Sequence, residues 1–179
     1  IGTAHDQGKT SGMLTIGATP GNVHVNEFDD ARREALKAQG FQAATPHDAS
    51  DYTPKGRFDA VVMNPPFGPV KDAKGESTKV DVDGYAIGQI DQLIAAKALA
   101  AMKADGCAVL ILGAHKVAGG VSNDDRIFFN WLYGNYNVTG HFEVNGDLYT
   151  RQGAGWPVRV IRIEGREKAG KFAPVAGTI

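Results

Sequence analysis

The chain has 179 residues, 42% of them hydrophobic, a formal net charge of −1 and a single cysteine. This length is typical of one domain with a substantial core, the lone cysteine excludes a disulfide framework and favours a reducing, cytoplasmic compartment, and no apolar run approaches the ~20 residues of a membrane span. The balanced charge lacks the basic excess of a domain that grips nucleic acid unaided. Because the chain begins at Ile1 rather than at a methionine, we expect it to be a piece of a longer polypeptide.

The first predicted strand covers residues 22–28. Its side chains alternate, with Val23 and Val25 inward and Asn26 outward, and it ends at Glu27. A period of two is the pattern of a half-buried strand, so the acidic side chain is expected at a strand end.

A helix and a second strand follow. An aspartate at 29–30 is a suitable N-cap for a helix that runs to about Gln39 and stops at Gly40. Residues 41–45 are then predicted to form a strand, and Asp48 lies just beyond its end.

The third predicted strand ends in an unusual tetrapeptide. Residues 58–63 are apolar and β-branched, which predicts a buried strand. The strand must stop at the prolines, because neither ring carries an N–H for a ladder. The result is a rigid tip that consists of Asn64, Pro65, Pro66 and Phe67.

The second half of the chain continues the alternation. Residues 68–86 are predicted as a long loop, 87–103 as an amphipathic helix, and 107–112 as a buried strand that includes Cys107. A helix over 123–133 follows.

The last two predicted strands cover 138–144 and 158–163. The segment between them has no helical pattern, so they are predicted to pair as an antiparallel hairpin at one edge of the sheet. The whole pattern predicts a single α/β domain over 1–179, with a mostly parallel, doubly wound sheet, an incomplete first strand and a loose tail over 166–179.

The chemistry of the tip suits a flat molecule with an amino group. The side-chain oxygen of Asn64 and the carbonyl of Pro65 can each accept one N–H of an exocyclic amine, which leaves the nitrogen lone pair available to a methyl donor. Phe67 can stack on the ring that carries the amine. An ordinary strand-to-loop turn is the structural alternative for these residues.

This tetrapeptide resembles the catalytic motif of amino-methylating, S-adenosylmethionine-dependent methyltransferases, chiefly the DNA adenine-N6 enzymes. A wider resemblance is to the methylase domain of strawberry-notch-type methylase-helicases of phages and plasmids. It is carried by residues 22–36, 64–68, 80–98 and 146–165 together. The resemblance covers about residues 10–165. It implies a Rossmann-like methyltransferase fold, S-adenosylmethionine as the cofactor, an adenine flipped out of DNA as the target, and further domains such as a helicase that grip the DNA.

The resemblance also implies roles for residues at the strand ends. Glu27 accepts the ribose hydroxyls of the cofactor, and Asp48 faces its adenine amino group. Asn64 is catalytic and is also expected among the residues that bind the cofactor. A carboxylate suits a ribose diol because it accepts two hydrogen bonds. Phe28 is expected to pack on the cofactor adenine, and Ala49 to contribute a backbone contact.

The glycine-rich turn that should precede these residues is only partly present. Gly12 fits the end of the family motif and is expected to bind the cofactor, whereas Gly8 and Lys9 depart from it. The string Gly8-Lys9-Thr10 lacks the upstream glycine spacing of a phosphate-binding loop.

Three alternatives stay open from the sequence. The same chemistry suits guanine N2 of ribosomal RNA or a glutamine side chain of a protein, and a degenerate methyltransferase fold can act as a binding module of a larger protein. Arg151, Gln152 and Trp156 either line the base pocket or form a plain hairpin loop. The five histidines show no metal-ligand spacing, so no metal is expected.

Overall fold

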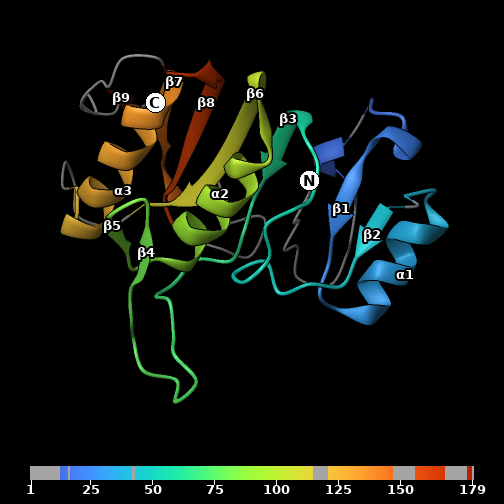
Figure 1. The fold of residues 1–179 in the computed structure, drawn as a ribbon, viewed down its shortest axis with the longest axis horizontal. Helices are drawn as coiled ribbons and strands as arrows, with labels where there is room; N and C mark the ends of the chain where they lie inside the picture. Colours follow the sequence, from blue (N-terminus) through green and yellow to red (C-terminus); the bar gives the residue numbers. More distant parts are fainter. Residues whose placement is uncertain are drawn as a thin grey trace.

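The computed structural model describes residues 13–15, 17–41, 43–114, 121–146, 156–167 and 177–178. These residues form an α/β fold (Figure 1). The helices are α1 (Asp30–Ala38), α2 (Ile90–Ala100), α3 (Asn123–Asn135) and the short 3-10 turns Met13–Thr15 and Pro20–Asn22. The strands are β1 (His24–Asn26), β2 (Ala43–Thr45), β3 (Phe58–Met63), β4 (Val80–Val82), β5 (Tyr85–Ile87), β6 (Met102–Gly113), β7 (Tyr136–Val144), β8 (Val158–Arg166) and β9 (Gly177–Thr178).

The largest sheet has five strands in the order β3-β6-β8-β7-β9. The pairs β3–β6 and β7–β9 are parallel, whereas β8 is antiparallel to both β6 and β7. The predicted antiparallel pairing of the last two long strands is confirmed. The sheet is mixed, because β8 runs opposite to the other four strands. It lies inside the sheet, where Ile161 and Ile163 are completely buried, and not at an edge.

A smaller parallel sheet joins β1 and β2, and α1 packs on it (Figure 1). Its core consists of Val25, Leu36 and Phe41. The predicted helix ends are confirmed: the Asp29 carboxylate accepts the N–H of Arg32, and the chain leaves α1 through a glycine with a positive φ. This unit places the ends of β1 and β2 next to each other.

The main core lies between the five-stranded sheet and the helices α2 and α3, which share one face of it (Figure 1). Met63, Leu110 and Ile161 from three neighbouring strands are buried there. The predicted helix over 87–103 is shorter at both ends, since Ile87 belongs to β5 and Met102 begins β6. The helix is buried nearly all round rather than amphipathic. Residues of the β4–β5 hairpin line a cavity together with residues of α2.

The other face of the sheet is more exposed. Val109 is 37% and Phe142 is 42% exposed, and the Cys107 side chain, predicted to be buried, is also exposed. The reason is the strand period: alternate residues of β6 point away from the helices. In the described residues, this face of the five-stranded sheet is therefore less covered than the face on which α2 and α3 pack.

The long loop predicted over 68–86 contains regular structure. Beyond residues 68–79, β4 and β5 pair around Asp83 and Gly84, both at positive φ. An Asp-Gly pair between alternating strands is a known hairpin signal, and it was present in the sequence. Residues 71–77 are all exposed and form an arm that projects from the fold, closed at its base by a bridge between Lys71 and Ser77 (Figure 1).

In the described part of the chain, every helix falls short of the length and apolarity needed to cross a lipid bilayer.

Candidate functional site

A cavity of about 290 Å³ lies where the ends of β1 and β2 meet the tip after β3. Its lining includes four of the residues predicted to bind the cofactor and one proline of the tip. These are Glu27, Phe28, Asp48, Ala49 and Pro66. The structure therefore brings together side chains that are up to 39 positions apart, counted from Glu27 to Pro66.

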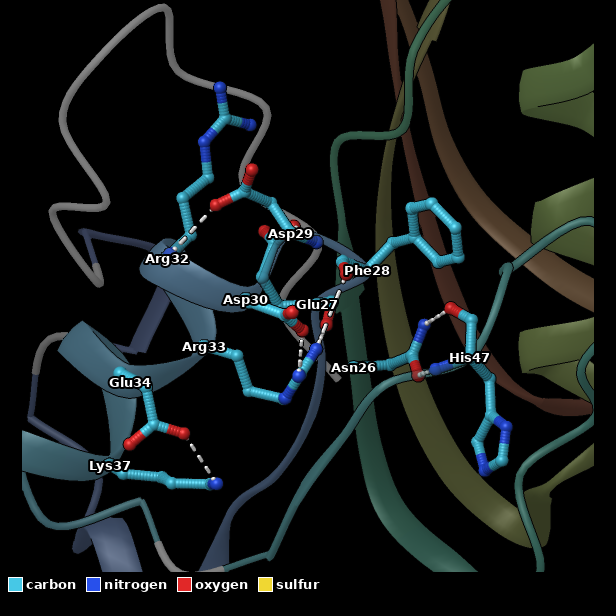
Figure 2. Close-up of polar contacts among 10 residues, drawn as sticks. All are labelled: Asn26, Glu27, Phe28, Asp29, Asp30, Arg32, Arg33, Glu34, Lys37 and His47. Carbon is cyan, nitrogen blue, oxygen red and sulfur yellow. Dashed lines mark hydrogen bonds and ion pairs between the residues drawn. The ribbon is translucent and has the colours of Figure 1, made fainter.

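Glu27 is held in place through its main chain and one carboxylate oxygen. Its N–H donates to the Thr45 carbonyl at 2.9 Å, and its carbonyl accepts from Nη1 of Arg33 at 3.0 Å. Its Oε1 accepts the N–H of Asp29 at 2.9 Å. The carboxylate is thus oriented at the strand end, and Figure 2 shows it beside the first turn of α1.

Phe28 is the most exposed large apolar side chain in the described ranges, at 71%. Its ring points away from α1 and toward the side of β1 where His47 lies (Figure 2). An exposed aromatic ring at the wall of a cavity is a suitable surface for a flat ligand.

Asn26 is a site residue that the sequence prediction missed. It was predicted to point outward, but its side chain is only 3% exposed. Its Nδ2 donates to the His47 carbonyl at 2.8 Å, and its Oδ1 accepts from the His47 N–H at 3.1 Å (Figure 2). The same oxygen accepts from the Thr45 hydroxyl at 2.8 Å. The amide thus fastens the segment after β2 to the end of β1. The only signal in the sequence was a polar residue among valines.

Asp48 comes directly after His47, the residue that Asn26 binds. Its Oδ1 accepts the N–H of Ser50 at 2.8 Å and its hydroxyl at 2.7 Å, a local turn that fixes the carboxylate. His47 is stacked on Tyr52, with ring centroids 4.1 Å apart.

The tip lies between this cavity and the end of β6. Pro66 lines the cavity and Pro65 is buried, whereas Asn64 and Phe67 are half-buried and do not line it. A Cβ atom placed on Gly113, the last residue of β6, would lie 3.2 Å from Cγ of Phe67, so the ring packs on that glycine.

A buried carboxylate supports the same region from α2. Asp91 Oδ2 accepts the Gly113 N–H at 2.9 Å. Burial raises the pKa of Asp91 from 3.8 to about 6, although the N–H of Gly113 lowers it in part. The group therefore titrates much closer to neutrality than an exposed aspartate.

Several predicted site residues cannot be placed. Gly12, Arg151 and Gln152 lie outside the described residues. Trp156 is described and is 44% exposed. Across the described ranges, no three His, Cys, Asp or Glu side chains are grouped so that they could hold a metal ion, and the absence of a metal stays a prediction.

A second cavity, of about 560 Å³, lies between the β4–β5 hairpin, α2 and α3. It is larger, but none of the predicted site residues lines it. Its aspartates and arginines largely bind the protein itself: Asp83 accepts from Nε1 of Trp131 at 3.0 Å, and Arg166 donates to the Met102 carbonyl at 3.2 Å. We therefore place the candidate site at the smaller cavity.

No protein-family model and no curated protein sequence matches the chain. Solved structures do match it. The chain is similar to a putative class I S-adenosylmethionine-dependent methyltransferase from Listeria monocytogenes, with a TM-score of 0.59 and 14% identity over 87% of this chain and 49% of that one. It is also similar to the type IIG restriction endonuclease BpuSI, with a TM-score of 0.54 and 16% identity over 87% of this chain and 20% of that one. The chain thus spans about half of the first protein and a fifth of the second, and at these identities the likeness shows that it has an α/β fold of the class I methyltransferase kind.

Proposed function

We propose that the chain is the methyltransferase part of a larger enzyme, which transfers a methyl group from S-adenosylmethionine to the N6 amine of adenine in DNA. The proposal includes a doubly wound methyltransferase sheet, a cytoplasmic location and further domains, such as a helicase, that supply DNA affinity. The observation that carries it is the cavity of about 290 Å³ that Glu27, Phe28, Asp48 and Pro66 line together.

The residues of this cavity fit the proposed cofactor. The fixed carboxylate of Glu27 suits a ribose diol, the exposed ring of Phe28 suits the face of an adenine, and the oriented Asp48 suits its amino group. When bound, S-adenosylmethionine supplies an electrophilic methyl group on a sulfonium centre. The similarity to a class I methyltransferase supports the same choice of ligand.

The tip is proposed to hold the target amine. The side-chain oxygen of Asn64 and the Pro65 carbonyl each accept a hydrogen bond from one N–H of the amine, which leaves the nitrogen lone pair available to the methyl donor. Phe67 stacks on the base. The reaction needs positioning and polarisation rather than a covalent enzyme intermediate. The similarity to a restriction endonuclease supports DNA as the substrate class.

The experiment begins with calorimetric titration of the chain with S-adenosylmethionine. It continues with transfer of a labelled methyl group to an adenine-containing duplex, a ribosomal RNA fragment and a glutamine peptide. We expect binding, and label in N6-methyladenine after nuclease digestion. Label in the RNA or in the peptide would show that RNA or protein, and not DNA, is the substrate. If S-adenosylmethionine does not bind, the chain is better explained as a binding module of a larger protein.

A further inference from the structure

Gly113 is the residue from which this inference starts. It ends β6, which pairs in parallel with β3, and β3 leads into the tip. A Cβ at Gly113 would lie 3.2 Å from Cγ and 3.4 Å from Cβ of Phe67. An added Cβ would have to displace the ring by a few tenths of an ångström, so the glycine lets the ring lie this close to the end of β6.

Asp91 binds the main chain of the same glycine. Its carboxylate is only 3% exposed and accepts the Gly113 N–H at 2.9 Å. A buried acceptor with one well-aligned donor defines the position of the peptide group that it binds. This bond fixes the end of β6 relative to the first turn of α2.

The first turn of α2 is also joined to the tip. Gly68 follows Phe67 directly, and its carbonyl accepts the N–H of Ile90 at 2.8 Å. Two adjacent residues of α2 therefore hold both partners of the contact between Phe67 and Gly113. Ile90 binds the main chain next to Phe67, and Asp91 binds the main chain of Gly113.

We propose that Asp91 is a positioning residue, which acts through the main chain of Gly113 to set the orientation of Phe67 and hence the surface offered to the target base. This inference rests on the proposed function. Asp91 is not a catalytic residue, since its carboxylate faces the protein backbone. What it contributes is a hydrogen-bond acceptor, so its negative charge is dispensable.

The closing experiment uses Asp91→Ala, Asp91→Asn and Gly113→Ala in the full chain. Asp59→Ala is the matched aspartate control, because its partner Lys103 is a surface residue. Gly134→Ala is the matched glycine control, because an added Cβ there has no neighbour within 4 Å. Two readouts need neither cofactor nor DNA: hydrogen exchange of the Gly113 amide and the ring-current shift of its Hα protons.

Asp91→Ala should speed exchange of the Gly113 amide by about tenfold or more and reduce the ring-current shift. Methylation should lose about tenfold or more in kcat, because small misplacements of a reacting group are costly, while the S-adenosylmethionine Kd stays within about twofold. Asp91→Asn should restore both signals. Gly113→Ala should also reduce kcat, whereas both controls behave like the wild type.

Unchanged Gly113 exchange and Hα shifts in Asp91→Ala would overturn the inference alone. A fall in stability without restoration by Asp91→Asn would also overturn it. If the proposed function is wrong, the wild-type chain will show the expected Gly113 exchange and Hα shifts but will transfer no methyl group to DNA. In that case the proposed role of Asp91 in catalysis is wrong as well. If Asp91→Ala does not fold, Gly113→Ala and Asp91→Asn decide the matter.

Discussion

Nη1 of Arg159 lies 2.8 Å from Oδ2 of Asp125, and the two side chains are 2% and 1% exposed. Asp125 Oδ1 also accepts from Nε2 of Gln92 at 2.7 Å, so the ion pair and this hydrogen bond connect β8, α3 and α2. For a buried ion pair, replacing both partners by apolar residues destabilises a protein less than removing one partner, because a single removal leaves an unpaired buried charge.

Asp125→Ala should therefore lower the free energy of unfolding by about 3–5 kcal/mol, because it leaves the Arg159 guanidinium buried without its closest carboxylate. The double variant Asp125→Leu/Arg159→Met should recover most of that loss. Urea unfolding followed by circular dichroism measures both. A single variant as stable as the wild type would show that the pair is not a structural element.

The raised pKa of Asp91 predicts how stability depends on pH. A carboxyl whose pKa is about 6 in the folded state and 3.8 in the unfolded state binds its proton more tightly when folded, so its contribution to stability falls as pH rises between these values. The free energy of unfolding of Asp91→Asn, relative to the wild type, should increase by about 3 kcal/mol from pH 3 to pH 7. Urea unfolding over this range is the measurement. Asp59→Asn should show the opposite sign, because Lys103 lowers the pKa of Asp59.

Asn64→Ala tests the tip. Loss of one acceptor for the target amine should reduce the methylation rate by about 100-fold or more, by analogy with a lost oxyanion donor. The Kd for S-adenosylmethionine should barely change, because Asn64 does not line the cofactor cavity. Asn137→Ala on β7 is the control, since Asn137 is a half-buried asparagine that donates to the Glu164 carbonyl. Full activity of Asn64→Ala would exclude the catalytic assignment.

Glu27→Ala tests the cofactor cavity. A methyl side chain accepts no hydrogen bond from a ribose hydroxyl, so binding of S-adenosylmethionine should weaken by about 1.5–3 kcal/mol. Glu34→Ala makes the same charge change on the exposed side of α1, where Glu34 pairs with Lys37, and should leave the Kd unchanged. Equal affinities for the two variants, measured by calorimetry, would place the ribose elsewhere.

Phe28→Ala separates binding from stability. The ring is 71% exposed, so its removal should leave the melting temperature unchanged. Affinity for S-adenosylmethionine should fall by at least about 0.5–1.5 kcal/mol, the value of an aromatic stacking contact. Phe142→Ala, a similarly exposed ring on β7, is the control. A melting temperature that falls in Phe28→Ala alone would indicate a packing role instead.

Local patterns in the sequence were sufficient for α1, for the strand that ends at Met63, and for the antiparallel pairing of β7 with β8. Each depends on neighbours in the chain: an N-cap with a terminal glycine, an apolar run stopped by two prolines, and a connection without a helical pattern. The same patterns placed Glu27 and Asp48 at strand ends, and the structure brings both to one cavity. The β4–β5 hairpin could have been predicted from Asp83-Gly84.

Other features depend on contacts between distant segments. The position of β8 between β6 and β7 requires knowledge of which strands share the core, and a period of two does not specify a neighbour. The exposure of Cys107 depends on which face of β6 the helices cover. Asn26 became a buried clamp only because residues 45–47 lie beside it, and Asp91 gained its raised pKa only where α2 meets the end of β6. Hydrogen bonds and burial of this kind arise from three-dimensional proximity, which local composition does not encode.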